Sequence, residues 1–117
     1  MGENLELSIV FPAYNEEANI VQSIREGLAA LEGRQGELVI VDDGSTDLTA
    51  SLVMECQSTD PRIVLQQHPS NKGYGAALLS GFRKARGRYV FFTDSDLQFD
   101  LKELQGFLLL IQHCDIV

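Results

Sequence analysis

Basic residues are scarce in this sequence. Its 117 residues include 9 lysines and arginines against 17 aspartates and glutamates, which gives a net charge of −8. A general nucleic-acid-binding protein needs a basic surface to neutralise phosphates, so that class is excluded. An acidic protein that binds a polyanion must do so locally, through backbone amides, a few basic side chains or a divalent cation.

Cysteine is also rare, and the two cysteines, Cys56 and Cys114, lie far apart in the sequence. Neither has another cysteine or a histidine at metal-ligand spacing, because His113, next to Cys114, would point the other way on a strand. We therefore expect two buried, reduced thiols in a cytoplasmic protein. The histidines His68 and His113 lie in no recognisable motif, and we expect both to be structural.

Long apolar runs are absent. The longest one covers residues 107–111, which is too short to span a bilayer. No basic segment followed by an apolar stretch marks a leader at the N-terminus. These features predict a soluble, cytoplasmic domain, and they leave open a longer parent at the cytoplasmic face of a membrane.

Strand-like and helix-like segments alternate strictly along the chain, whose length fits a single domain. Strands are predicted at 5–11, 37–41, 63–66 and 89–92, with amphipathic helices after each of them. This alternation predicts an α/β fold with a mainly parallel sheet and helices on both faces. Pro12 is expected to end the first strand and Asn15 to cap the first helix. Leu78, Phe82 and Ala85 are expected on the inner face of the third helix.

The last residues, 115–117, look like the opening of a fifth strand. Domains rarely end inside a strand, so we interpret the chain as incomplete at its C-terminus. A cut strand would leave a sheet edge that invites self-association.

Acidic residues gather where the predicted strands end. The candidates are Glu16 after the first strand, Asp42 and Asp43 after the second, and Asp94 and Asp96 after the fourth. In an open α/β sheet, ligands bind beyond the carboxyl ends of the strands, near a reversal in strand order. So many carboxylates at one edge would repel each other, and a divalent cation is the usual remedy.

The Asp94-Ser95-Asp96 segment is the most specific of these clusters. Residues two apart on an extended segment point to the same side, so both carboxylates could share one hard cation. Mg²⁺ typically takes one or two carboxylates together with substrate phosphates. A solvated turn is the alternative for an isolated Asp-x-Asp, but the position after YVFFT and before a helix favours the cation site.

The Asp42-Asp43-Gly44-Ser45 segment has two interpretations. It could be only a turn and a helix cap, with Gly44 at positive φ and Ser45 or Thr46 as the capping residue. Alternatively, one carboxylate accepts a hydrogen bond from a base or a ribose. In that case the carboxylate should lie at a solvated strand end, so that its removal hardly affects folding.

Two further features are ambiguous in the same way. Tyr14 is either an aromatic residue at a helix edge or a side chain that lies against a base. Lys72-Gly73-Tyr74-Gly75 places two glycines at a helix start, where the backbone can approach an anion closely.

Four segments, taken in order, resemble family 2 glycosyltransferases of the GT-A fold. They are FPAYNE (11–16), VDDGSTD (41–47), NKGYGAA (71–77) and FTDSDLQFD (92–100). The last two are most similar to the branch that glycosylates polyprenyl or dolichyl phosphates. The resemblance covers essentially the whole chain, and residues 1–117 would then be the nucleotide-sugar-binding part of the catalytic domain.

The resemblance implies roles for matching positions. Base and ribose would be bound by Pro12, Tyr14, Glu16, Val41 and Asp43, with Lys72 and Gly73 close by. The sugar diphosphate would be lined by Thr93, Asp94 and Ser95. Asp94 and Asp96, with Gln98, would hold Mg²⁺ or Mn²⁺ and serve catalysis. A hexose would move with inversion from a UDP- or GDP-sugar to an acceptor such as a polyprenyl phosphate.

Three alternatives remain. The first is a nucleotide-diphosphate-binding module without turnover, because the residues expected to hold the acceptor would follow Val117. The second is a receiver-type signalling domain, although its acidic pair would follow the first strand and a phosphoacceptor aspartate the third. The third is a sugar nucleotidyltransferase, although Ala13-Tyr14-Asn15-Glu16 stands where that class has a glycine-rich basic loop.

Overall fold

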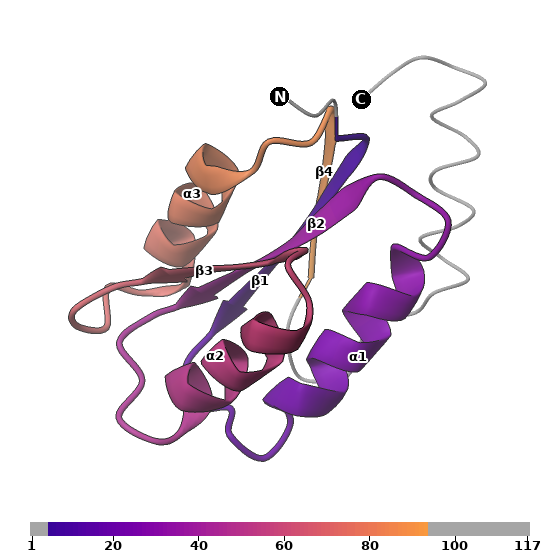
Figure 1. Cartoon of the computed structure of the whole chain (residues 1–117). Coiled ribbons are helices and arrows are strands. Elements are labelled where there is room, and N and C mark those ends of the chain that lie inside the picture. The colour runs from indigo at the N-terminus through magenta and orange to yellow at the C-terminus, as the bar shows by residue number, and fades with distance from the viewer. Residues whose placement is uncertain (1–4, 94–117) are drawn as a thin grey trace.

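The computed structural model describes residues 5–93, which form a parallel four-stranded sheet with three helices (Figure 1). The strands are β1 (Leu7–Ala13), β2 (Gly36–Asp42), β3 (Ile63–Gln67) and β4 (Tyr89–Phe92). The helices are α1 (Ile20–Ala30), α2 (Thr49–Thr59) and α3 (Tyr74–Lys84). Strands and helices alternate and all three strand pairs are parallel, so the predicted α/β fold is confirmed.

The strands lie side by side in the order β3-β2-β1-β4. The chain therefore steps outward from β1 to β2 to β3 and then returns to the other side of β1 as β4. This reversal between β1 and β4 is the position at which open α/β sheets bind ligands, at the carboxyl ends of the strands.

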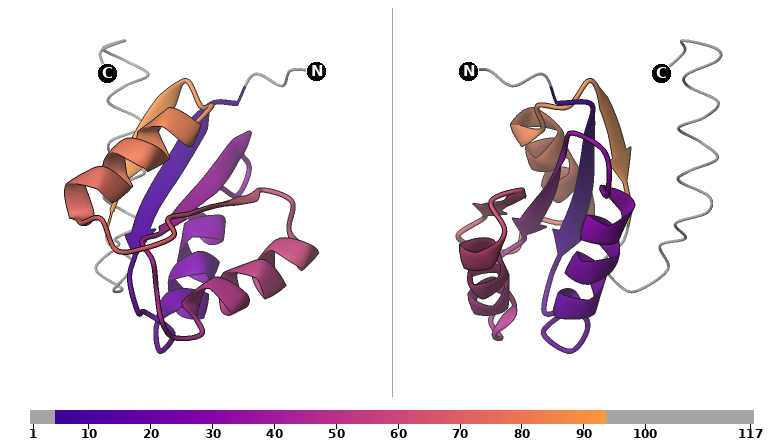
Figure 2. Two further views of the ribbon diagram at one scale, coloured as in Figure 1. Left: turned by 90° about the vertical axis from the view of Figure 1, so that its left-hand side faces the viewer. Right: turned by 45° about the vertical axis from the view of Figure 1, so that its right-hand side comes forward.

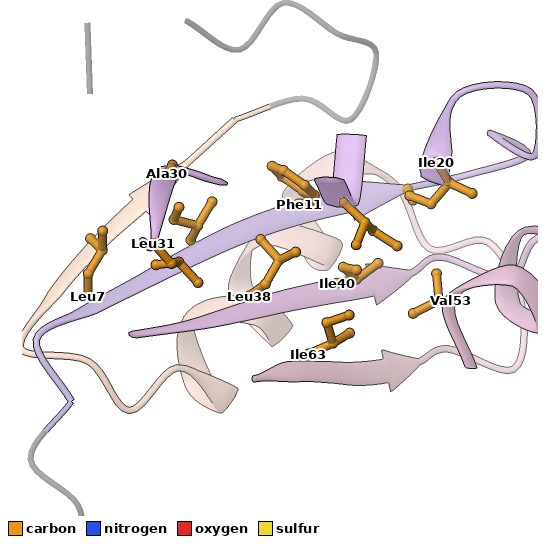
Figure 3. Packing of buried hydrophobic residues seen from close by; sticks show 12 residues of the cluster. Leu7, Phe11, Ile20, Ala30, Leu31, Leu38, Ile40, Val53 and Ile63 are labelled. Atoms are coloured by element: carbon orange, nitrogen blue, oxygen red, sulfur yellow. The ribbon is translucent and has the colours of Figure 1, made fainter. Parts of the chain in front are cut away.

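Helices cover both faces of the sheet, α1 and α2 on one face and α3 on the other (Figure 2). The larger apolar cluster lies under α1 and α2 and includes Phe11, Leu38 and Ile40 (Figure 3). A smaller cluster under α3 has Val10, Val39, Val41 and Ala77 as its buried members within residues 5–93. Successive strand residues point to opposite faces, so β1 and β2, buried from both sides, are apolar almost throughout.

The prediction that Pro12 ends the first strand is wrong, because β1 continues through Pro12 to Ala13. The Val10 carbonyl accepts a hydrogen bond from Thr93 N at 3.1 Å, so Val10 and Pro12 both turn their backbone toward β4. The registered pairing on that side ends at Val10 with Phe92. The absent N–H of Pro12 therefore costs no hydrogen bond within the registered ladder.

The prediction for the inner face of the third helix is also wrong for Phe82, whereas Ala85 packs against the cluster under α3 as predicted and Leu78 is half-buried. Ala77 and Gly81 are the buried residues of α3, whereas Phe82 is 40% exposed. The Phe82 ring meets Phe92 edge-on, with 5.6 Å between the ring centroids. A Cβ on Gly81 would lie 2.4 Å from Cγ1 of Val10, so α3 packs too close to the sheet for a large residue. Periodicity of large apolar residues cannot reveal a helix face selected for small ones.

A buried carboxylate joins the elements at the amino end of the sheet. The Glu37 side chain is 1% exposed and accepts hydrogen bonds from Ser8 Oγ and from Arg86 N, both at 2.6 Å. The Arg86 side chain adds a contact of 3.3 Å from its Nε. This network ties β1 and β2 to the segment that joins α3 to β4, at the end of the sheet opposite the carboxyl ends of the strands.

Within the described part of the chain, no helix has both the length and the apolar character needed to cross a bilayer. The residues expected to open a fifth strand, 115–117, lie outside the described residues.

The close packing of α3 predicts opposite effects for one substitution at two sites of this helix. Gly81→Ala should destabilise the chain by about 1–3 kcal/mol, because its methyl group overpacks the contact with Val10. Gly75→Ala meets nothing within 4 Å and should stabilise the helix by up to about 1 kcal/mol. Urea unfolding of both variants measures the difference, and equal effects at the two sites would contradict the packing described here.

Candidate functional site

The segments that follow the strands begin side by side at the carboxyl edge of the sheet. Asp43 N donates to the Ala13 carbonyl at 2.8 Å, and His68 N donates to the Asp42 carbonyl at 2.9 Å. Thr93 N bonds to the carbonyl of Val10 on the other side of β1. Pro12, Val41, Asp43 and Thr93, which the sequence predicted as site residues, therefore all lie at or next to this edge.

The loop after β1 is bound to the loop after β2 through Asn15. Asn15 has a φ of 52°. Its backbone N–H donates to Ser45 Oγ at 2.9 Å, and its side-chain oxygen accepts from Thr46 N at 2.8 Å. The prediction that Asn15 caps α1 is therefore wrong, since the side chain crosses to the neighbouring loop instead. Tyr14, directly before it, is 45% exposed at this edge.

The start of α2 is capped from two sides. Thr49 N donates to Asp47 Oδ1 at 2.9 Å, and Leu48 N donates to Oε1 of Glu17 from the first loop, also at 2.9 Å. Glu16 N in turn donates to Thr49 Oγ1 at 2.8 Å, while the Glu16 side chain is only half-buried. The expected cap at Ser45 or Thr46 is wrong, because the helix begins at Thr49.

The Asp42-Asp43-Gly44-Ser45 segment does form the predicted turn. Asp42 is 2% exposed, and its Oδ1 accepts a hydrogen bond from Ser45 N at 3.2 Å. Gly44 has a φ of 74°, and a Cβ there would lie 2.4 Å from the backbone nitrogen of Asn71. Glycine is required both by the backbone conformation and by the approach of the segment after β3.

The Asp43 carboxylate is the centre of the hydrogen-bond network at this edge. Its Oδ1 lies 2.7 Å from His68 Nδ1 and accepts from Lys72 N at 2.9 Å, while Oδ2 accepts from Gly73 N at 2.9 Å. Burial acts to raise the pKa of Asp43, but these hydrogen bonds outweigh it and hold the pKa below its ordinary value. The carboxylate is therefore ionised at neutral pH.

Two expectations change with this geometry. The expectation of a solvated Asp43 is wrong, because the residue is only 4% exposed. The glycine-containing segment at the start of α3 does bring backbone amides to an anion, but the anion found there is the chain's own Asp43 carboxylate. Gly73 has a φ of 104°, a conformation that L side chains rarely adopt.

His68 connects this network to α3. The residue is 9% exposed, and its Nε2 lies 2.8 Å from Ser80 Oγ on that helix. The sequence interpretation treated His68 as structural without finding its partners. The signal that was available is its position directly after a predicted strand, at the same sheet edge as the acidic pair.

The predicted metal-binding and diphosphate residues Asp94, Ser95, Asp96 and Gln98 lie outside the described residues. Residues 5–93 contain no group of three or more histidine, cysteine or acidic side chains placed to hold a metal ion. Thr93, the last described residue, is fixed at the carboxyl edge by its bond to Val10, on the side of β1 opposite β2.

A comparison with known protein families shows to which family the chain belongs. The family described as "Glycosyl transferase family 2" matches residues 8–117. The chain belongs to glycosyl transferase family 2. The parallel sheet with helices on both faces is the GT-A fold that the sequence predicted, and the signalling receiver alternative is excluded.

The relatives that the chain resembles are sugar transferases by name. The chain is 40% identical over 111 residues to the low-salt glycan biosynthesis hexosyltransferase Agl6 of Haloferax volcanii, covering 93% of this chain and 25% of that protein. It is 42% identical over 102 residues to an undecaprenyl-phosphate 4-deoxy-4-formamido-L-arabinose transferase of Pseudomonas aeruginosa, covering 84% of this chain and 30% of the relative. The chain thus spans about a quarter to a third of the length of these relatives.

Solved structures of other proteins share the fold. The mannosyltransferase PcManGT of Pyrobaculum calidifontis, in complex with GDP-Man and Mn²⁺, superposes with a TM-score of 0.79 at 26% identity. TarS of S. aureus in complex with UDP-GlcNAc gives 0.78 at 28% identity. These superpositions cover 93% of this chain and 33% and 32% of those chains, respectively.

The buried Asp43 carboxylate predicts a pH-dependent contribution to stability. Asp43→Asn should lower the free energy of unfolding at pH 7 by about 1–3 kcal/mol, because the amide cannot accept all three hydrogen bonds. A carboxyl group with a lowered folded-state pKa stabilises above its unfolded pKa of about 3.9. The difference between wild type and variant should therefore be full at neutral pH and shrink as the pH falls below about 4.

Chemical unfolding at pH 7, 5 and 3.5 measures this effect. Glu55→Gln is the control, because it removes one negative charge at an exposed position of α2 and should change stability by less than about 0.5 kcal/mol. The same loss for Asp43→Asn at all three pH values would show that its ionised form is not what stabilises the fold.

Proposed function

We propose that this chain is the donor-binding part of a hexosyltransferase that uses a UDP- or GDP-sugar and a divalent metal ion. The observation that carries the proposal is that the loop after β1, the Asp43 network and Thr93 all lie at the carboxyl edge of the sheet, beside the reversal between β1 and β4. Similarity to structures in complex with GDP-Man and Mn²⁺ and with UDP-GlcNAc supports this choice of ligand.

The proposed base and ribose subsite lies over the loops after β1 and β2. It comprises Pro12, Tyr14, Glu16, Val41 and Asp43. The exposed Tyr14 ring supplies an aromatic face for the base. An ionised carboxylate offers about four acceptor positions, and three donors already bind Asp43, so one position on Oδ2 remains for a base N–H or a ribose hydroxyl.

The proposed diphosphate subsite begins where the chain leaves β4. Thr93, Asp94 and Ser95 would line the sugar diphosphate, and Asp94, Asp96 and Gln98 would hold Mg²⁺ or Mn²⁺. Oxygen ligands of this kind suit either ion. When bound, such an ion would neutralise the negative charge that develops on the departing nucleoside diphosphate. The exposed Lys72 side chain, next to the Asp43 network, adds a basic group near the same edge.

The proposed acceptor is a polyprenyl phosphate, as the names of the Pseudomonas relative and of a dolichyl-phosphate β-glucosyltransferase of Trichomonas vaginalis suggest. A phosphate oxyanion is itself a nucleophile, so transfer needs no protein base to create one. A single displacement at the anomeric carbon inverts its configuration. Because the acceptor is a lipid, transfer would occur at a membrane surface, which we propose to be the cytoplasmic face.

Nucleotide binding without turnover is a second candidate for the chain taken alone. The observation that favours it is the share of the relatives covered, 25% and 30%. Holding an acceptor in line with the sugar supplies much of the rate of such reactions. Product analysis with UDP- and GDP-sugars and a short polyprenyl phosphate separates the two candidates, because only a transferase yields a glycosylated lipid.

The proposal predicts metal-dependent nucleotide binding. Calorimetry with UDP and GDP should give an affinity at least about tenfold higher in Mn²⁺ than in excess chelator, or about 1.4 kcal/mol. The reason is that the edge is otherwise acidic and repels a diphosphate. The double variant Asp94→Asn/Asp96→Asn should abolish the difference between the two conditions.

The charge-matched control for this experiment is Asp100→Asn/Glu103→Gln, which removes two negative charges from the same region without touching the proposed ligands. It should retain the metal dependence. Equal affinity of the wild-type chain for UDP or GDP in Mn²⁺ and in excess chelator would contradict the proposal that a metal ion bridges the chain and the diphosphate.

The Tyr14 ring offers a second test, which separates binding from folding. Tyr14→Ala should weaken nucleotide binding by about 1–3 kcal/mol, as expected for loss of a base-stacking partner. Because the residue is 45% exposed, stability should change by less than about 0.5 kcal/mol. Tyr14→Phe keeps the ring and should bind as the wild type does; unchanged binding by Tyr14→Ala would exclude stacking.

A further inference from the structure

We propose that His68 is a positioning residue for the donor nucleotide, acting by fixing the orientation of the Asp43 carboxylate. This inference rests on the proposed function, because it assigns to Asp43 an acceptor position that faces the nucleotide. His68 itself touches no reacting group in the proposal. Its effect passes through Asp43.

The contacts of His68 come from the end of β2 and from α3. Its backbone N–H bonds to the carbonyl of Asp42 at the end of β2, and its Nδ1 lies 2.7 Å from Asp43 Oδ1. On the opposite side of the ring, Nε2 lies 2.8 Å from Ser80 Oγ in the middle of α3. The imidazole is therefore held at both nitrogens, between the strand end that carries Asp43 and the helix that packs over it.

These contacts fix the proton on the ring. An ionised carboxylate can only accept hydrogen bonds, so Nδ1 of His68 must carry a hydrogen and donate it to Asp43. In the neutral ring Nε2 then has a lone pair, which accepts the hydroxyl hydrogen of Ser80. The Ser80 hydroxyl can donate to that lone pair, so this contact is compatible with the tautomer that Asp43 requires.

The burial of the pair makes the orientation specific. The side chains of His68 and Asp43 are 7% and 5% exposed, so water has little access to replace either partner. His68 and Lys72 N both use Oδ1, and Gly73 N uses one position on Oδ2. The two donors on Oδ1 fix the plane of the carboxylate, and they thereby fix the direction in which the remaining acceptor position on Oδ2 points. Without His68 the carboxylate loses the one side-chain donor that residues 5–93 give it, and with it this constraint.

The order Ser80, His68, Asp43 is also that of a hydrolytic triad, but the setting of Ser80 argues against nucleophilic chemistry. Ser80 lies inside α3, where backbone N–H groups are bonded within the helix. Such a serine has no pair of free amides beside it to stabilise an oxyanion. The geometry fits a positioning role and not an acyl-transfer site.

Two conservative substitutions of His68 separate the two ring contacts. The side-chain amide of His68→Asn occupies the place of Nδ1 and can still donate to Asp43, whereas that of His68→Gln reaches the place of Nε2 and contacts Ser80. If His68 acts through Asp43, His68→Gln should weaken UDP or GDP binding in Mn²⁺ by about tenfold or more, as for loss of an oriented charge-assisted hydrogen bond. His68→Asn should retain affinity within about threefold, even where both variants lose similar thermal stability.

A measurement on the wild-type chain keeps the inference testable if a variant fails to fold. The ¹⁵N shifts and long-range couplings of the His68 ring should show the proton on Nδ1. A proton on Nε2 alone would overturn the arrangement, whether or not nucleotide binds.

The outcomes distinguish this inference from the proposed function. If the wild-type chain binds neither UDP nor GDP, the proposed function fails and the role of His68 in binding fails with it. If the wild type binds and the Asn and Gln variants lose affinity equally, or neither loses any, His68 is only structural and the inference is overturned.

Discussion

The hydrogen bonds between the Asp43 carboxylate and the segment from His68 to Gly73 are the interaction on which this edge of the molecule depends. They join the end of β2 to the segment that leads from β3 into α3. A buried carboxylate is costly unless its charge is compensated, and here two backbone amides and an imidazole compensate it. The same bonds place the start of α3, and with it Lys72, beside the loop that follows β2.

The sheet is fixed at its other end by a second buried carboxylate, that of Glu37, bonded to Ser8 and Arg86. Between the two, α3 lies against β1 and β2 at a distance set by Gly81 and Ala77. The carboxyl edge is therefore a rigid platform built from three strands and one helix. Rigid support of this kind is what a binding site needs, because the groups facing the ligand cannot themselves be packed.

The fold could be predicted from the sequence, because alternation of apolar strands and amphipathic helices is a local signal that extends along the whole chain. Prediction failed where a long-range contact overrides the local pattern. Phe82 follows helical periodicity, yet α3 turns Gly81 to the sheet because of the close approach to Val10. Asn15 suits a helix cap by type, yet it bonds to Thr46 in a loop that is distant in sequence.

The candidate site shows the same division. The position of Asp43 at the carboxyl edge follows from topology and was predicted, whereas its burial and its partner His68 are visible only once three elements are packed together. No local motif marks His68. Its two ring partners, Asp43 and Ser80, lie 25 residues before it and 12 residues after it in the chain.

The most direct test of a donor site at the carboxyl edge is paramagnetic broadening of amide resonances by Mn²⁺ in the presence of UDP or GDP. A donor site at this edge should give the strongest broadening for residues 13–16, 43–46, 71–74 and 93–96, and sharp resonances around Ser8, Glu37 and Arg86 at the opposite end. Broadening centred on that opposite end, or a pattern that does not change when the nucleotide is added, would contradict it.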